Sequence, residues 1–133
     1  MMAMFSQCNE LEYLDLSNWN TSNVTNMEIM FNECYKLKKI KGINNFIINK
    51  VESMKGMFNK CSEIEYLDLS NWNTSNAKNM SFMFNECNKL KYLNLLNFSS
   101  NCSTKNMLSF HKIQNFEFIT NNLDLWELYD FSQ

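Results

Sequence analysis

Five cysteines are the first residues in this sequence whose type could support chemistry. Four of them recur at a nearly even spacing, at Cys8, Cys34, Cys61 and Cys87. Metal sites usually use close Cys-X-X-Cys pairs, and the sequence contains none. The even spacing instead indicates one repeat position filled by a small apolar residue, so we predict buried free thiols. Cys102 lies outside this spacing, and we expect it to be the exposed and reactive thiol.

Two further sets of residues could support catalysis. His111 is the only histidine, and Ser-His-Asp or Cys-His chemistry would need a nucleophile and an orienting group beside it. Asp15 and Asp68 occupy equivalent repeat positions, about 10 Å apart across two strand spacings, near the upper limit for an inverting glycosidase pair. Lys41 lies between them, which predicts an Asp-Lys-Asp ladder on an open sheet. We therefore expect no enzyme, no metal and no cofactor.

The element that positions these residues is a repeat whose period is about 26 residues. Residues 12–23 read EYLDLSNWNTSN, and residues 65–76 read the same letters. Met-Phe pairs precede the four regular cysteines, at Met4-Phe5, Met30-Phe31, Met57-Phe58 and Met83-Phe84. Residues 1–109 therefore divide into four repeats, at about 4–29, 30–56, 57–82 and 83–109. We expect the rings of Trp19 and Trp72, which follow a recurrent Asn, to lie in the core.

Each repeat combines two periodicities. Leu14 and Leu16 alternate with Tyr13 and Asp15, which is typical of a strand. Within residues 25–34 the apolar residues follow at steps of three, one and three, which predicts a short helix or a 3₁₀ turn. The pattern therefore predicts an α/β repeat fold, with a parallel sheet on one side and helical turns on the other.

The repeat resembles the leucine-rich-repeat family, and most closely its BspA-like branch. That branch reads MF-x-x-C-x-x-L-x-x-L-D-L-S-x-[WF]-[ND]-T-S-x-V-x-N-M, which residues 57–80 match nearly throughout, with Ala77 in place of Val. The resemblance covers about residues 4–110. It implies a leucine-rich-repeat-like solenoid without enzymatic activity, of a kind often found in secreted or lipid-anchored surface proteins of bacteria and protists. Some members of the branch are adhesins for host matrix proteins.

The two ends of the chain depart from the pattern. We expect one inserted residue between Phe98 and Met107, and residues 110–133 to form a degenerate repeat and a C-terminal cap. The chain begins in mid-repeat without a visible cap, so we expect the edges of Leu14, Leu16 and Trp19 to be exposed. This predicts self-association through the first repeat, or a missing upstream sequence. No signal peptide is visible, so localisation stays open, although the resemblance suggests the cell surface or secretion.

Composition excludes several classes of function. No apolar run approaches the length of a membrane helix, so we expect no membrane insertion. The net charge is −2, and we interpret the one basic cluster as a solvated strand edge, with no nucleic-acid binding. That cluster consists of Lys36, Lys38, Lys39 and Lys41. The chain has only two glycines, which excludes phosphate-binding loops. One of them, Gly42, lies at an extra residue that predicts a β-bulge.

The outward face of the strands is the remaining candidate for function. Equivalent positions place Tyr13, Tyr66 and Tyr92 in one row with Lys39. Asp15, Lys41, Asp68 and Asn94 form a second row beside it. Tyrosine contributes contact area at a low cost in conformational entropy, so these eight residues form a hypothetical partner-binding site. The alternative is that they are ordinary solvated residues of a sheet.

The functional prediction is a non-enzymatic protein–protein interaction module, specifically a fragment of a surface adhesin. An intracellular scaffold of the same fold and a degenerate fragment without present activity stay open as alternatives. An upstream export signal would favour the adhesin, and a genuine start at Met1 would favour the alternatives. The sequence does not identify the partner, which would be a host matrix protein or another surface protein if the chain is exported.

Overall fold

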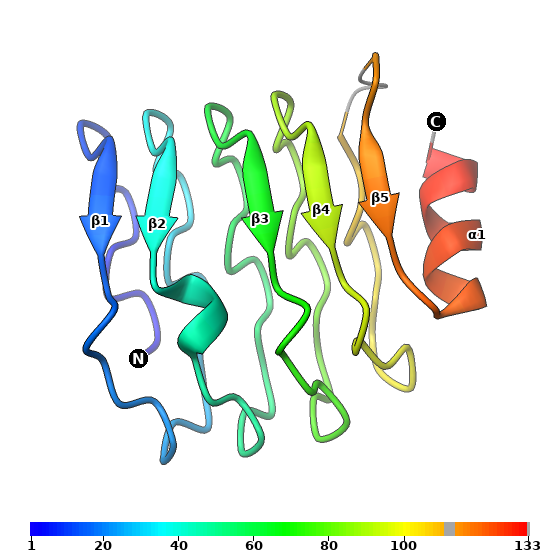
Figure 1. Cartoon of the computed structure of the whole chain (residues 1–133), viewed down its shortest axis with the longest axis horizontal. Helices are drawn as coiled ribbons and strands as arrows, with labels where there is room; N and C mark the ends of the chain where they lie inside the picture. The colour runs from blue at the N-terminus through cyan, green and yellow to red at the C-terminus, as the bar shows by residue number, and fades with distance from the viewer. Residues whose placement is uncertain (111–113, 133) are drawn as a thin grey trace.

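The computed structural model describes residues 1–110 and 114–132. Five strands of three residues each lie side by side and point the same way (Figure 1). They are β1 (Tyr13–Asp15), β2 (Lys39–Lys41), β3 (Tyr66–Asp68), β4 (Tyr92–Asn94) and β5 (Glu117–Ile119). A 3₁₀ helix, η1 (Ile43–Asn45), follows β2, and one α-helix, α1 (Leu123–Ser132), follows β5.

The strands form two parallel sheets. One contains β1 and β2, with Leu14 opposite Ile40, and the other contains β3, β4 and β5 in that order. On the other side of each repeat, isolated parallel bridges join Asn26 to Ser53, Ser53 to Asn79 and Asn79 to Ser103. Successive repeats are therefore hydrogen-bonded to each other on two sides, except between β2 and β3, where only the bridge side is paired.

The predicted helices within the repeats do not form. Within residues 25–34, Ile29 and Glu33 have positive φ angles of 46° and 59°, and a left-handed residue cannot continue a right-handed helix. Their N–H groups donate instead to the carbonyls of Lys55 and Asn59 in the next repeat, both at 2.8 Å. The spacing of three, one and three thus belongs to a series of turns whose backbone groups bond between repeats.

The predicted fold class is therefore wrong in two respects. The chain is not an α/β repeat, because its described residues form short β-strands and turns, with a single α-helix near the C-terminus. It also lacks the one continuous sheet face with helical turns behind it that a leucine-rich-repeat-like solenoid implies, because the strands are split between two short sheets. The β-bulge predicted at Gly42 is absent as well, since η1 takes up the extra residue.

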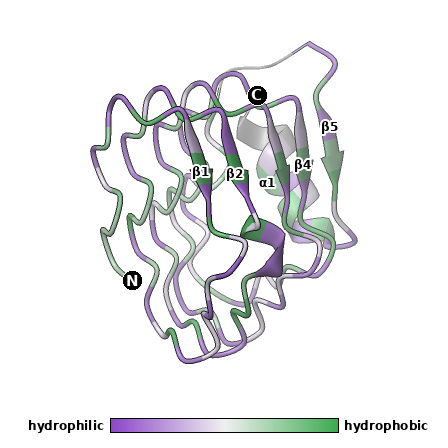
Figure 2. Ribbon diagram, turned by 60° about the vertical axis from the view of Figure 1, so that its left-hand side comes forward, coloured by the Kyte–Doolittle hydropathy of each residue, from purple (hydrophilic) through white to green (hydrophobic). Residues whose placement is uncertain are grey.

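Hydrophobic and hydrophilic residues alternate along the chain (Figure 2). In the core, equivalent side chains of consecutive repeats form ladders. The rings of Phe5, Phe31, Phe58 and Phe84 stack with centroids 5.4 to 5.7 Å apart. Beside this ladder the Asn59 side-chain amide donates to the Asn32 side-chain oxygen at 2.7 Å, and Asn85 repeats the bond to Asn59 at 2.7 Å. Equivalent residues of consecutive repeats thus stabilise one another directly.

The fourth repeat is shorter than expected. Asn79 pairs with Ser103, and the Phe84 N–H donates to the carbonyl of Met107. Met107 therefore lies opposite Met83, and the predicted insertion before it is wrong. Beyond this repeat, β5 and α1 lie at the C-terminal end of the row of strands (Figure 1). His111, the histidine considered for catalysis, falls outside the described residues.

The first repeat differs in burial from the others. Leu16 is only 1% exposed, which corrects the prediction that its edge is open, whereas Trp19 is 38% exposed. Met2 and Met4 are also exposed in this repeat. In the part of the chain that the structure describes, no helix has the length and apolar character needed to cross a membrane.

Candidate functional site

The structure places the tyrosine row on the strands in two parts, one in each sheet. Tyr13 lies opposite Lys39 in the first sheet, and Tyr66 lies opposite Tyr92 in the second. The rings of Tyr66 and Tyr92 stack at 4.4 Å with an angle of 8° between their planes. Tyr13 is 51% exposed and Tyr66 is 59% exposed, so both present large ring surfaces. The Asn94 amide supports this row by donating to the Tyr92 hydroxyl at 3.2 Å.

The second row is only partly connected. Lys41 Nζ lies 2.8 Å from Asp15 Oδ2, and the Ser17 N–H donates to the other carboxylate oxygen. The hydrogen bond from Lys41, followed by those from Ser17, lowers the pKa of Asp15 below its ordinary value. Asp68 accepts the Ser70 N–H at 3.0 Å, but no ion pair among the described residues joins it to Lys41. The predicted Asp-Lys-Asp ladder therefore has only its first half.

Ion pairs in and just before the strands join the first repeat to the second and the third to the fourth, whereas Glu33–Lys60 and Glu52–Lys78 join the second repeat to the third away from the strands. Acidic residues of the first repeat bind lysines of the second, in the pairs Glu10–Lys36, Glu12–Lys38 and Asp15–Lys41. Acidic residues of the third repeat bind lysines of the fourth, in the pairs Glu63–Lys89 and Glu65–Lys91. Each pair is exposed and contributes little to stability by itself. Together they direct the lysines of the second repeat and the carboxylates of the third away from the junction between these two repeats.

A hollow of about 490 Å³ opens at that junction, between β2 and β3. Lys39 and Lys41 line one side, and Tyr66 and Asp68 line the other. A second hollow of about 470 Å³ lies between Tyr35 and Lys36 of the second repeat and Ser62 and Glu63 of the third. Lys38 lines both hollows, which places them next to each other along the same junction.

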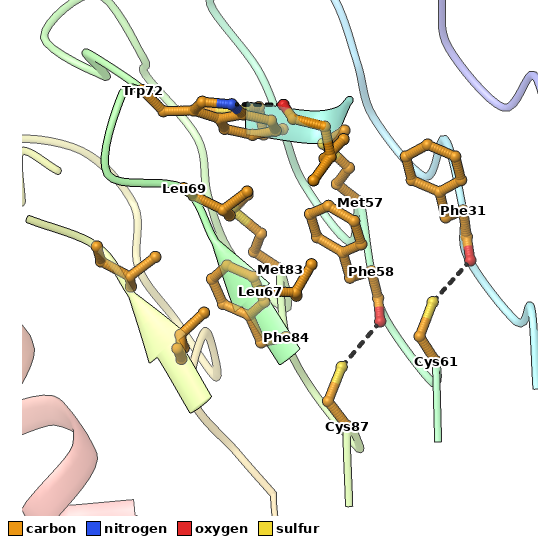
Figure 3. Close-up of a cluster of buried hydrophobic side chains, with 14 of the residues drawn as sticks. Phe31, Met57, Phe58, Cys61, Leu67, Leu69, Trp72, Met83, Phe84 and Cys87 are labelled. Atoms are coloured by element: carbon orange, nitrogen blue, oxygen red, sulfur yellow. Dashed lines mark hydrogen bonds between the residues drawn. The ribbon is translucent and has the colours of Figure 1, made fainter. Parts of the chain in front are cut away.

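The regular cysteines have a structural role in the described core. Cys34, Cys61 and Cys87 are fully buried, as predicted. The Cys61 thiol donates to the Phe31 carbonyl at 3.1 Å, and the Cys87 thiol donates to the Phe58 carbonyl at 3.1 Å (Figure 3). Burial raises the pKa of Cys34 to about 11 and that of Cys87 to about 12. These thiols therefore stay protonated at neutral pH and are poor nucleophiles.

Cys102 is less available than the sequence suggested. Its side chain is half-buried, and burial raises its pKa above the ordinary value. Cys8, in the first repeat, is also only half-buried. Among the described residues, no group of three or more His, Cys, Asp or Glu side chains is arranged to hold a metal ion.

We expect the five thiols to fall into two classes of alkylation rate. At pH 8, a pKa of about 11 in place of 9.0 leaves Cys34 with about 100-fold less thiolate, and burial slows Cys61 and Cys87 further. Peptide mapping after timed iodoacetamide treatment should find Cys8 and Cys102 modified first. In concentrated guanidinium all five should react at similar rates. Native Cys61 reacting as fast as Cys8 would contradict this burial.

A comparison with protein families covers nearly the whole chain. The family model described as "Mycoplasma protein of unknown function, DUF285" matches residues 1–126. The chain belongs to the DUF285 family. No match was found among curated proteins or among solved structures. Membership of DUF285, a family of unknown function, assigns the chain no activity.

The eight strand-face residues of this DUF285 chain lie on the strands as the sequence predicted, but sequence reasoning missed the hollow between them. The row is divided between two sheets, so Tyr13 and Lys39 lie on one side of the junction, and Tyr66 and Tyr92 lie on the other. A signal was available in the extra residue at Gly42. An irregular residue immediately after a strand indicates that the strand edge beside it is disturbed.

Proposed function

We propose that this chain is a non-enzymatic protein-binding module whose strand face contacts the partner. The observation that carries the proposal is the outward row of Tyr13, Lys39, Tyr66 and Tyr92, in which the rings of Tyr13 and Tyr66 are exposed and the strands are paired within each sheet. Exposed tyrosines on a rigid support are typical of protein recognition, because they bury area while losing few rotamers.

Supporting features on the same face favour a macromolecular partner. The stack of Tyr66 on Tyr92 restricts both rings before binding, which lowers the entropy lost on association. The charges beside the row are largely neutralised in pairs, such as Lys41 with Asp15, so they cost little to desolvate at the rim of an interface. An aromatic centre with a polar rim is the usual anatomy of a protein–protein interface.

The resemblance to BspA-like surface proteins supports a more specific form of the proposal. In that form the module is part of a surface adhesin, and its partner is a host matrix protein. Labelling of intact cells with a membrane-impermeant amine reagent separates this form from an intracellular scaffold. A label acquired by this chain before lysis supports the adhesin, and a label acquired only after lysis leaves the scaffold.

The strand face is tested by replacing Tyr13, Tyr66 and Tyr92 together with Ala. With purified matrix proteins as probes in biolayer interferometry, we expect the parent chain to bind at least one, and the triple variant to bind it at least about tenfold more weakly. The matched control replaces Ile47 and Leu96, which are exposed apolar residues outside the strands, and should bind as the parent does. A folded triple variant with unchanged affinity would reject the proposed face.

A further inference from the structure

β2 and β3 are the only consecutive strands in the described chain that are not paired with each other. They stand visibly farther apart than the other neighbours (Figure 1). On β2, the Lys39 N–H and the Lys41 carbonyl bond to the first repeat, so the backbone groups of Ile40 between them face β3. By the same alternation, the backbone groups of Tyr66 and Asp68 face β2. Two strand edges with unpaired donors and acceptors therefore border the hollow.

The side chains around the junction keep these edges open. Gly42 turns the chain at a φ of 81° directly after β2, and η1 follows where the other repeats continue without a helix. Lys38 and Lys41 extend toward the first repeat, and Glu65 extends toward the fourth. No ion pair between described residues therefore crosses the hollow on the strand face.

The charges that line the hollow favour an acidic ligand. Lys39 is exposed, and no hydrogen bond or ion pair involves its ammonium group among the described contacts. Lys38 and Lys41 line the same side, but each is paired with a carboxylate of the first repeat. On the opposite side Glu65 is neutralised by Lys91, and Asp68 accepts a backbone N–H. The lysine side therefore offers one cation, Lys39, without a partner among the described residues, and a carboxylate of a ligand can approach it.

We propose that the junction between β2 and β3 binds an extended peptide segment with acidic side chains. The peptide backbone pairs with an open strand edge, a carboxylate approaches the ammonium group of Lys39, and a neighbouring side chain packs on Tyr66. The adjoining hollows, which share Lys38, give the segment a path along the strands. Unpaired strand edges recognise extended peptides through main-chain hydrogen bonds. The inference rests on the proposed protein-binding function and names its binding mode and the chemistry of its partner.

The test uses a short capped peptide of alternating valine and glutamate, added to the full ¹⁵N-labelled chain. We expect the amide signals of Ile40, Tyr66 and Asp68 to shift in a saturable way. A valine–lysine peptide of the same length should bind at least about tenfold more weakly, because it meets the lysine side with like charge. N-methylation of alternate residues of the acidic peptide should abolish the shifts, because it removes main-chain donors.

Two charge reversals locate the site. Lys39→Glu should weaken binding of the acidic peptide at least about fivefold. Lys55→Glu is the matched control, because Lys55 is exposed and lies outside the strands, and it should leave the affinity nearly unchanged. Equal effects of the two variants, equal binding of the basic peptide, or the absence of shifts at millimolar acidic peptide would each overturn the inference.

Failure here is distinguishable from failure of the proposed function. If the peptide leaves β2 and β3 unperturbed while the triple tyrosine variant still loses its protein partner, the strand face binds proteins but the junction is not a peptide site. If the peptide shifts the amide signal of Ile40 while the triple variant keeps its protein partner, the junction is supported as a peptide site. The tyrosine row is then rejected as the protein-binding face.

Discussion

Replacement of Trp72 by Ala should lower the free energy of unfolding by about 3 to 5 kcal/mol. The indole is completely buried and lies between the rings of Phe46 and Phe98, at centroid distances of 6.2 and 6.4 Å. Its Nε1–H donates to the Ile43 carbonyl at 3.0 Å (Figure 3). The substitution removes the ring from the middle of the ladder and leaves a buried carbonyl without its donor, and both effects destabilise the fold.

Trp19 is the matched control, because it occupies the same position in the first of the two identical segments, 12–23 and 65–76. It is 38% exposed, and its ring centroid lies 5.8 Å from that of Phe5, with an angle of 37° between the ring planes. Trp19→Ala should therefore cost only about 1 to 2 kcal/mol. Urea unfolding followed by circular dichroism measures both variants. Equal losses in the free energy of unfolding would mean that the burial of Trp72 in the ladder does not determine its contribution to stability.

Much of the repeat could be predicted because its signals are local. Alternation of Tyr13, Leu14 and Asp15 predicted β1, and the same pattern predicted β3 and β4 at the correct residues. The recurrence of Cys at one repeat position predicted four buried thiols, of which three are fully buried, whereas Cys8 is half-buried. In each case the side-chain pattern alone indicates which face of the chain is buried.

The turns could not be predicted because they depend on contacts between repeats. Ile29 and Phe82 have φ angles of 46° and 59°, which branched and aromatic residues rarely adopt. The N–H groups of both donate to the next repeat at 2.8 Å, to the carbonyls of Lys55 and Lys105. Hydrogen bonds between consecutive repeats offset the local strain. The spacing of apolar residues does not predict these hydrogen bonds.

The candidate site was predicted in its composition but not in its shape. Equivalent positions placed Tyr66 and Tyr92 together, and the structure stacks them. The gap between β2 and β3 instead coincides with the left-handed conformation of Gly42 and with the pairing of Lys41 to Asp15 in the first repeat. Conformation at a single glycine and the choice of ion-pair partner are decided by the packed chain, so repeat alignment alone cannot give them.

Gly42→Ala should lower the free energy of unfolding by about 3 kcal/mol or more, through backbone strain and a steric clash together. At its φ of 81° any other residue is strained by about 1 to 2 kcal/mol. An added Cβ would also lie 2.5 Å from Ser17 Cα and 2.6 Å from the Ser17 nitrogen. Backbone atoms cannot rotate aside, so the two repeats must separate locally, at a further cost of about 1 to 3 kcal/mol.

The matched control is Gly56→Ala, whose φ of 60° is also positive. Its added Cβ would lie 3.2 Å from the Cγ2 methyl of Ile29 and 3.7 Å from Asn59 Cβ, which are both side-chain atoms. Ala3 and Phe82 adopt the same left-handed conformation at the equivalent repeat position, so a side chain is accommodated there. Gly56→Ala should therefore cost only the backbone strain of about 1 to 2 kcal/mol in urea unfolding. If both alanine variants lost the same stability, the close approach of Gly42 to Ser17 could not be what fixes the chain after β2, and the origin of the open junction would have to be sought in the ion pairs alone.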